Sequence, residues 1–145
     1  MLSMYPACFF EDTDGYSVIF PDLENGNLAT CGDTLEDAMC MAIDCLAGYI
    51  YISQKDGDTL PTPSSLSDID IHAIEKELIN NGCPPSTNCF VNMVSVDVEA
   101  YAKKHFEKSV KKTLTIPAWL NEKALEQNIN FSQVLQEALL AKLML

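Results

Sequence analysis

Near the C-terminus a lysine and two threonines stand at every second position, and both residue types can contact nucleic acid. In the segment KKTLTI, Lys111, Thr113 and Thr115 fall on one face of a predicted strand, whereas Leu114 and Ile116 fall on the other. Threonine can hydrogen-bond a base edge or touch a thymine methyl group, and lysine can reach guanine or phosphate. The polar face of this strand is therefore a candidate DNA-binding surface.

The helix expected to begin after Asn130 offers a second contact with nucleic acid. Asparagine is a favoured N-cap residue, and the first N–H groups of a helix lack partners within it. Those N–H groups and the positive end of the helix dipole are suited to phosphate. Asn130, Phe131 and Ser132 are therefore candidate DNA-contacting residues.

A plainer interpretation of both segments is equally compatible with the residue types. Thr113 and Thr115 could be ordinary strand-forming residues on a solvated face, and Asn130 could do no more than cap its helix. Spacing alone does not separate these two interpretations.

The predicted strand and the two helices after it cannot form a hydrophobic core in a single copy. One helix is expected from Pro117 to about Gln127, where Asn128 can adopt the left-handed conformation that ends a helix. The next, at 130–143, carries an apolar stripe at helical spacing: Phe131, Val134, Leu135, Ala138, Leu139 and Leu143. Since a lone strand leaves its edge unpaired, we expect it to pair with the same strand of a second chain. The resulting two-stranded ribbon would fit a DNA major groove.

Catalytic chemistry has weak support in the sequence. Asp14, Asp22, Asp33 and Asp37 lie in elements that could bring carboxylates to a divalent metal ion. However, the first hundred residues hold 13 further carboxylates that are equally available. The predicted fold also has too few strands to assemble a complete nuclease site. We therefore predict no catalytic residues and a protein that is not an enzyme.

Cysteine and histidine spacing predicts neither a metal site nor a cofactor. The six cysteines include no Cys-x-x-Cys pair, and His72 and His105 do not complete a zinc-binding pattern. We expect the cysteines to be buried, reduced thiols. Both histidines are expected to be solvated helix residues.

The sign of the charge changes along the chain. Residues 1–100 hold 17 Asp and Glu against two Lys, a formal charge of −15, whereas residues 101–145 hold seven Lys against four Glu, or +3. This asymmetry indicates two partners, one basic and one acidic. No secretory signal is visible at the start, and the longest apolar stretch is too short for a membrane span. A soluble, cytoplasmic protein without a membrane partner is expected.

The first hundred residues predict an α+β domain with the element order β-β-β-α-(α)-β. The expected strands are Tyr5–Phe10, Tyr16–Phe20, Leu28–Cys31 and Cys89–Val98. Thr34 is expected to cap a helix whose apolar stripe is Leu35, Ala38, Met39, Ala42, Ile43 and Leu46. A long loop is expected at 54–67, a second helix at 71–80 and a helical connector at 101–109.

Several motifs resemble those of one known family, the HicB antitoxins. The segments YPA (5–7), GYSVIFPDL (15–23) and GDTLEDA (32–38) resemble the N-terminal signature of that family. The segments KKTLTIPAWL (111–120) and NFSQVL (130–135) resemble the subgroup that ends in a ribbon-helix-helix domain. The turn ENGNL replaces the Pro-Gly-Cys type of turn that is usual in the family.

This resemblance implies a fold and a function. It implies a partial RNase H-like domain at 1–100 that binds a HicA-type toxin, a connector at 101–109 and a ribbon-helix-helix domain at 110–145. HicA toxins are small mRNA-cleaving ribonucleases, and a basic partner of that kind would be attracted by the acidic domain. The resemblance further implies a homodimer, or a tetramer, that binds operator DNA and acts as transcription repressor of its own operon.

One alternative function is compatible with the same pattern. An α+β domain joined to a ribbon-helix-helix module also fits a stand-alone transcription regulator that senses a small ligand. A neighbouring gene for a small basic protein with a lone histidine would favour the antitoxin interpretation, whereas a ligand sensor needs no such neighbour.

Overall fold

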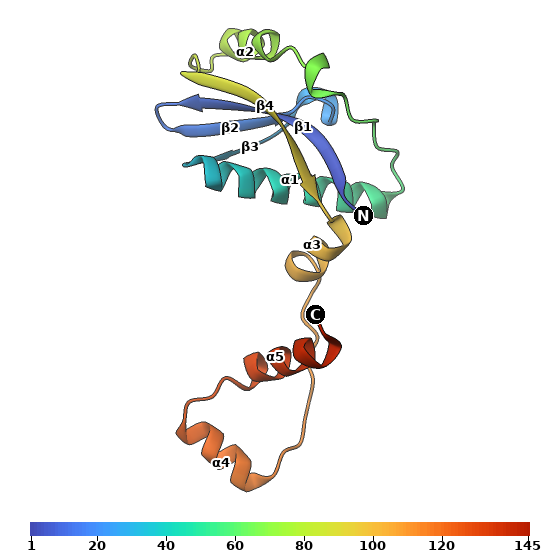
Figure 1. Ribbon diagram of the computed structural model, residues 1–145, viewed down its shortest axis with the longest axis vertical. Coiled ribbons are helices and arrows are strands. Elements are labelled where there is room, and N and C mark those ends of the chain that lie inside the picture. The colour runs from blue at the N-terminus through green and yellow to red at the C-terminus, as the bar shows by residue number, and fades with distance from the viewer. The chain divides into compact units, whose positions relative to one another are not determined.

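The computed structural model describes residues 1–145, which divide into two compact units, residues 1–108 and residues 109–145. The first unit is an α+β structure with one antiparallel sheet and helices on both of its faces (Figure 1). None of the helices is both long enough and apolar enough to cross a membrane.

The sheet of the first unit has four antiparallel strands in the order β3-β2-β1-β4. Their bounds are β1 Ser3–Asp12, β2 Gly15–Phe20, β3 Leu28–Gly32 and β4 Asn88–Val96. β1 and β2 form a tight hairpin, because the side chain of Asp12 accepts hydrogen bonds from the N–H groups of Asp14 and Gly15. The predicted strands are therefore present, and β4 ends two residues earlier than expected.

The alternation of side chains along the strands creates two apolar faces. Phe9 stacks on Phe90 with ring centroids 5.0 Å apart, and this pair joins the larger core beneath helix α1. Val18 and Phe20 point to the same core, whereas Ile19 belongs to a smaller cluster on the opposite face. Side chains of β2 therefore alternate between the two faces of the sheet.

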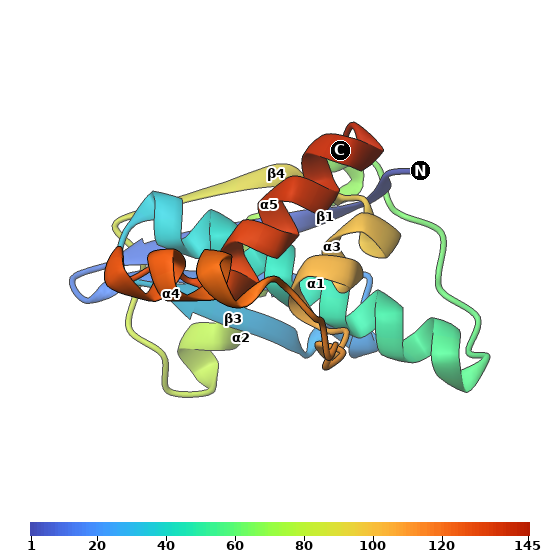
Figure 2. The same ribbon diagram turned by 90° about the horizontal axis from the view of Figure 1, so that it is seen from below.

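Helix α1, Leu35–Asp56, runs lengthwise along one face of the sheet (Figures 1 and 2). The Thr34 side chain caps it by accepting from the Asp37 N–H at 3.1 Å, as predicted. Its core-facing side chains include alanines, so the helix axis can approach the sheet closely; those that are fully buried are Ala38, Ala42, Leu46, Ala47 and Ile50. Leu35, expected in the buried stripe, is instead 45% exposed.

The loop predicted at 54–67 begins later than expected, because α1 continues to Asp56 and ends at Gly57 with a φ of 74°. Beyond Gly57 the loop is fixed to the sheet by side chains. The Tyr5 hydroxyl donates to the Pro61 carbonyl at 2.6 Å, and the Asp22 carboxylate accepts from Ser64 N–H and Oγ at 2.8 and 2.7 Å.

Helix α2, Ile71–Asn80, lies on the face of the sheet opposite to α1 (Figure 1). Its residues Ile71, Ile74 and Leu78 pack on the smaller core cluster, but none of the residues of α2 is fully buried. The helix is therefore held by a thin apolar contact.

Helix α3, Val98–His105, packs on α1 within the same unit. Val98 and Ala102 are buried, and the Tyr101 hydroxyl donates to the Asp44 carboxylate at 2.8 Å. The segment expected as a connector thus begins inside a packed helix.

The second unit holds helices α4, Ala118–Glu126, and α5, Phe131–Leu143. Asn128 separates them with a φ of 54°, which confirms the predicted left-handed terminating residue. The strand predicted over Lys111–Ile116 is not formed in the single chain, because no other segment pairs with it. No residue of this unit is buried; Ala124 and Leu135 are partly buried, and the other side chains are more exposed.

Candidate functional site

The residues that the sequence singles out for DNA contact all lie in the second unit and are all exposed. Lys111, Thr113 and Thr115 precede α4 in the segment that has no strand partner. Their side chains make no hydrogen bond or ion pair within the chain. They are therefore free to contact a partner.

Asn130 is the N-cap of α5, as predicted. Its side-chain oxygen accepts from the Gln133 N–H at 3.1 Å, and its carbonyl accepts from the Val134 N–H at 3.0 Å. The N–H groups of Phe131 and Ser132 come before this first intrahelical bond and have no helical acceptor. The start of α5 thus offers two free donors and the positive end of a helix dipole.

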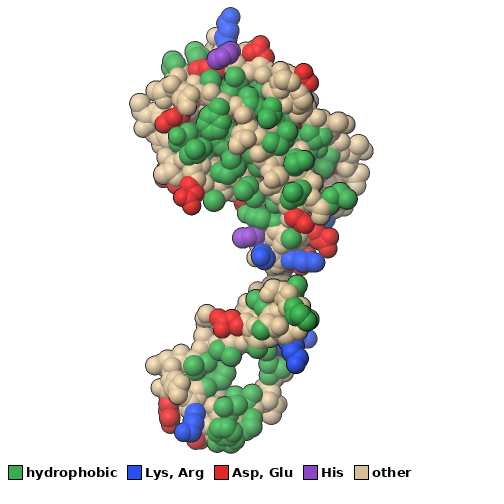
Figure 3. Space-filling view, in the orientation of Figure 1, with side chains coloured by type: hydrophobic (Ala, Val, Ile, Leu, Met, Phe, Trp, Pro, Cys, Tyr) green, Lys and Arg blue, Asp and Glu red, His purple; other side chains and the backbone are tan.

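An apolar groove of about 480 Å³ lies between the KKTLTI segment and α5. Its apolar lining comes from Leu114, Ile116, Phe131, Val134, Leu135 and Ala138. Lys112, Asn121 and Ser132 also line the groove, whereas Thr113 and Thr115 do not. Figure 3 shows hydrophobic side chains at the surface of this unit.

The four carboxylates considered for catalysis take part in local structure. Asp22 holds Ser64 of the loop after α1, and Asp37 lies in the first turn of α1. Asp14 and Asp33 border a shallow hollow beside the β1–β2 hairpin. Asp14 and Asp33 thus border the same hollow, whereas the Asp22 carboxylate is occupied by its hydrogen bonds with Ser64.

The cysteines differ from the sequence prediction, because only Cys8 is buried. Burial raises the pKa of the Cys8 thiol to about 11. Cys31, Cys40 and Cys83 are exposed, and the remaining two are partly buried. The prediction of buried thiols was wrong for Cys31, Cys40 and Cys83, whereas Cys45 and Cys89 pack against the two core clusters.

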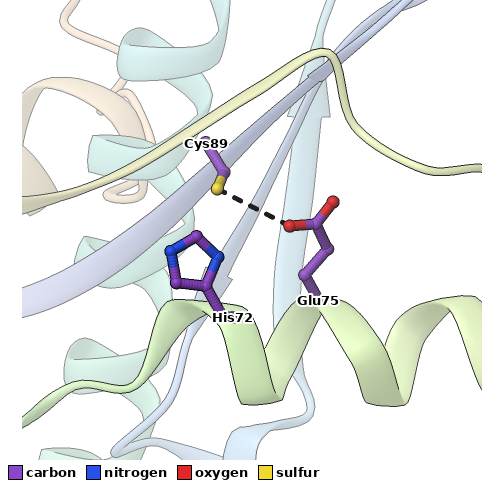
Figure 4. Close-up of side chains that lie close together, drawn as sticks. All are labelled: His72, Glu75 and Cys89. Atoms are coloured by element: carbon purple, nitrogen blue, oxygen red, sulfur yellow. Dashed lines mark hydrogen bonds between the residues drawn. The ribbon is translucent and has the colours of Figure 1, made fainter.

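The fold brings together one cluster of potential metal ligands that the sequence does not predict. His72 and Glu75 of α2 and Cys89 of β4 place one ligand atom each within 4.8 Å of one another (Figure 4). Hydrogen bonds from Ser86 lower the pKa of Glu75, whereas burial, followed by the nearby Glu75 charge, raises the pKa of Cys89. The spacing of His72 and Glu75 by three positions was the available signal, but their meeting with Cys89 depends on how α2 lies over β4.

Comparison with known proteins relates the chain to bacterial toxin–antitoxin systems. The model of the HicB-like antitoxin family of these systems matches residues 4–74. A solved structure described as a toxin–antitoxin complex from Streptococcus pneumoniae contains a chain that is 32% identical, with a TM-score of 0.59. That similarity covers 98% of this chain and 99% of the solved one, and therefore includes both units.

Two further relatives are known from sequence. Antitoxin HicB 2 of Photorhabdus laumondii is 39% identical over 61 residues, which are 42% of this chain and 42% of that relative. An uncharacterized 14.9 kDa protein of Haemophilus phage HP1 is 28% identical over 117 residues, 81% of this chain and 75% of the phage protein. The sheet, its covering helices and these matches define an antitoxin fold. The chain belongs to the HicB family of antitoxins.

Proposed function

We propose that the chain is the antitoxin of a HicA–HicB pair. Its first unit binds and neutralises a small basic ribonuclease of the HicA type. Its second unit pairs with that of another copy to form a ribbon-helix-helix domain over residues 110–145, binds operator DNA and represses the shared operon. In this proposal the sheet of the first unit is a partial RNase H-like fold that serves as a binding platform and has no catalytic role.

The single observation that carries the proposal is the absence of a buried core in the second unit. Leucine, isoleucine and phenylalanine side chains line an open groove there, and not one residue of the unit is buried. Each such side chain gains about 1.5–3 kcal/mol when it is fully buried. A second copy would cover the groove with its own Leu114 and Ile116, since strand pairing brings the same residues of both chains together.

The polar side of the paired strands would then carry the DNA contacts. Two copies of Lys111, Thr113 and Thr115 would project from a two-stranded ribbon of the size that enters a major groove. The free N–H groups of Phe131 and Ser132 would hold the phosphates at either end.

The charge distribution supports two separate partners. A protein that binds mRNA needs a basic surface, and the −15 charge of the first hundred residues would accelerate its encounter with the antitoxin. Four of the seven lysines in the remaining residues lie in the second unit, whose formal charge of +1 is doubled in a dimer and would meet the phosphates of DNA. The description of the solved S. pneumoniae relative as a toxin–antitoxin complex is in keeping with a toxin partner.

Co-expression with the product of the adjacent gene tests the proposal. We expect the full chain to co-purify with a small basic protein and to restore growth of cells that express this protein. If the neighbouring product is not toxic, or if the chain neither binds it nor rescues growth, the antitoxin role is wrong. A DNA-binding protein that fails both tests would instead support the ligand-sensing regulator.

A further inference from the structure

We propose that His72, Glu75 and Cys89 form a binding site for a divalent metal ion of the zinc type, which links α2 to β4. The site is separate from the DNA-contacting residues and does not depend on the proposed function. Figure 4 shows the three side chains converging from the helix and from the neighbouring strand.

The geometry of the three ligand atoms suits a single ion. The sulfur of Cys89 lies 3.7 Å from Oε2 of Glu75, close to the separation of two ligands that bind one zinc ion at about 2.0 and 2.3 Å. All three atoms lie within 4.8 Å of one another, so a small rotation of the His72 side chain brings its ring nitrogen into range. His72 is exposed and makes no hydrogen bond within the protein, so this rotation breaks no hydrogen bond.

Ser86 holds the carboxylate of Glu75 in the orientation that a ligand needs. Its hydroxyl and its N–H both donate to Oε1 of Glu75, at 2.7 and 3.3 Å. The other oxygen, Oε2, is left facing the thiol of Cys89. Hydrogen bonds of this kind, which orient a metal-binding side chain, are typical of metal sites.

The donor set favours zinc over harder or softer ions. One thiolate, one imidazole and one carboxylate are the three ligand types that Zn²⁺ uses, and calcium or magnesium would require oxygen ligands alone. Binding replaces the proton of the Cys89 thiol, which passes to solvent, with the metal ion. Because His72 is exposed, water can occupy the fourth position of a tetrahedral ion.

The ion would reinforce a weakly attached helix. None of the residues of α2 is fully buried, so its attachment depends on partly buried isoleucine and leucine side chains. A metal bound by two residues of α2 and one of β4 would fix this helix against the sheet. We therefore expect the metal to raise the thermal stability of the protein and to protect the amide protons of α2 from exchange.

Cobalt titration of the full, reduced chain tests the site, because Co²⁺ replaces Zn²⁺ and absorbs visibly. We expect one Co²⁺ per chain, with a thiolate-to-cobalt absorption band that Zn²⁺ removes. Cys89→Ser should abolish this band, whereas the matched variant Cys83→Ser, which changes an exposed cysteine between α2 and β4, should retain it.

The two histidines provide the second comparison. His72→Ala should weaken Co²⁺ binding at least tenfold and remove the stabilisation by Zn²⁺, yet leave the stability of the metal-free protein unchanged because the side chain is exposed. His105→Ala should bind the metal like the original chain. The proposal is wrong if the band survives Cys89→Ser, if Cys83→Ser removes it equally, or if His72→Ala binds as tightly as His105→Ala.

Discussion

Lys111 and Thr113 both belong to the KKTLTI segment but would contribute to DNA binding in different ways. A lysine that neutralises a phosphate supplies affinity for any sequence, and its contribution falls as salt rises. A threonine that touches a base edge supplies discrimination between sequences. The proposed ribbon therefore predicts different consequences for their removal.

We expect Lys111→Ala to weaken operator and non-specific DNA binding alike and to flatten the salt dependence by about one unit of slope for each phosphate that is no longer neutralised. Thr113→Ala should instead weaken operator binding by about 1–3 kcal/mol and leave non-specific binding nearly unchanged. Fluorescence anisotropy with operator and scrambled duplexes over a range of salt concentrations measures both effects. Lys55→Ala, a change in α1 of the first unit, is the matched control.

Both variants should still bind the toxin, since the substituted residues lie outside the first unit. Simultaneous failure of toxin binding and DNA binding would contradict the separation of the two activities.

Tyr101 provides a test of how α3 is attached to the first unit. Burial, followed by the hydrogen bond to Asp44, raises the pKa of Tyr101 from an ordinary 10.0 to about 12. Because the folded pKa is above that of the unfolded chain, the contribution to stability is full below pH 10 and disappears as the pH rises toward 12.

We therefore expect Tyr101→Phe to lower the free energy of unfolding by about 1–2 kcal/mol at neutral pH, because a hydrogen bond to a charged acceptor is removed. The difference between the variant and the original chain should shrink between pH 10 and pH 12. Urea denaturation at several pH values measures it, and a difference that does not change with pH would show that the hydrogen bond is unimportant.

At the scale of elements, the groove between the KKTLTI segment and α5 is the feature that a second chain would cover in the proposed dimer. Val134 lines this groove and is 48% exposed, whereas Gln136 lies on α5 outside the groove lining. A charge in the groove would remain buried and unpaired if two chains closed over it.

We expect Val134→Asp to produce monomers at micromolar concentration and to abolish DNA binding, while Gln136→Asp remains dimeric. Analytical ultracentrifugation of the two variants measures this difference. Equal oligomeric states for both would show that the groove is not the interface between chains.

The sequence predicts elements well where the signal is local. Thr34 caps α1 and Asn130 caps α5 because capping depends on a side chain and an N–H three residues away. The end of α1 was misplaced because Lys-Asp-Gly-Asp is typical of a turn, although Ile50 and Ser53 are buried and extend the helix toward Asp56.

The candidate sites also include features with a local sequence signal and features without one. The apolar and polar sides of KKTLTI follow from alternation, and α5 from helical spacing, so both could be predicted. The cluster of His72, Glu75 and Cys89 could not, because it requires α2 to fold over β4. The strand is absent from the single chain because no segment of the chain pairs with residues 111–116, and in the proposed dimer the same segment of a second copy would supply the hydrogen bonds.

For the whole molecule, the acidic charge lies in the first unit: residues 1–108 hold 18 Asp and Glu against five Lys, a formal charge of −13, whereas residues 109–145 hold four Lys against three Glu, or +1. The first unit has its own hydrophobic core beneath α1 and a second cluster beneath α2, both formed within the single chain. The second unit buries nothing by itself. We infer that the second unit mediates association between copies of the chain and that the first unit binds the toxin.

The molar mass in solution, measured by light scattering, tests this account most directly. The full chain should have twice the 16.0 kDa mass of a single copy, or a higher even multiple, and a chain that lacks residues 109–145 should be a folded monomer that still binds the toxin. A full chain that remains at 16.0 kDa, or a shortened chain that is still dimeric, would contradict it.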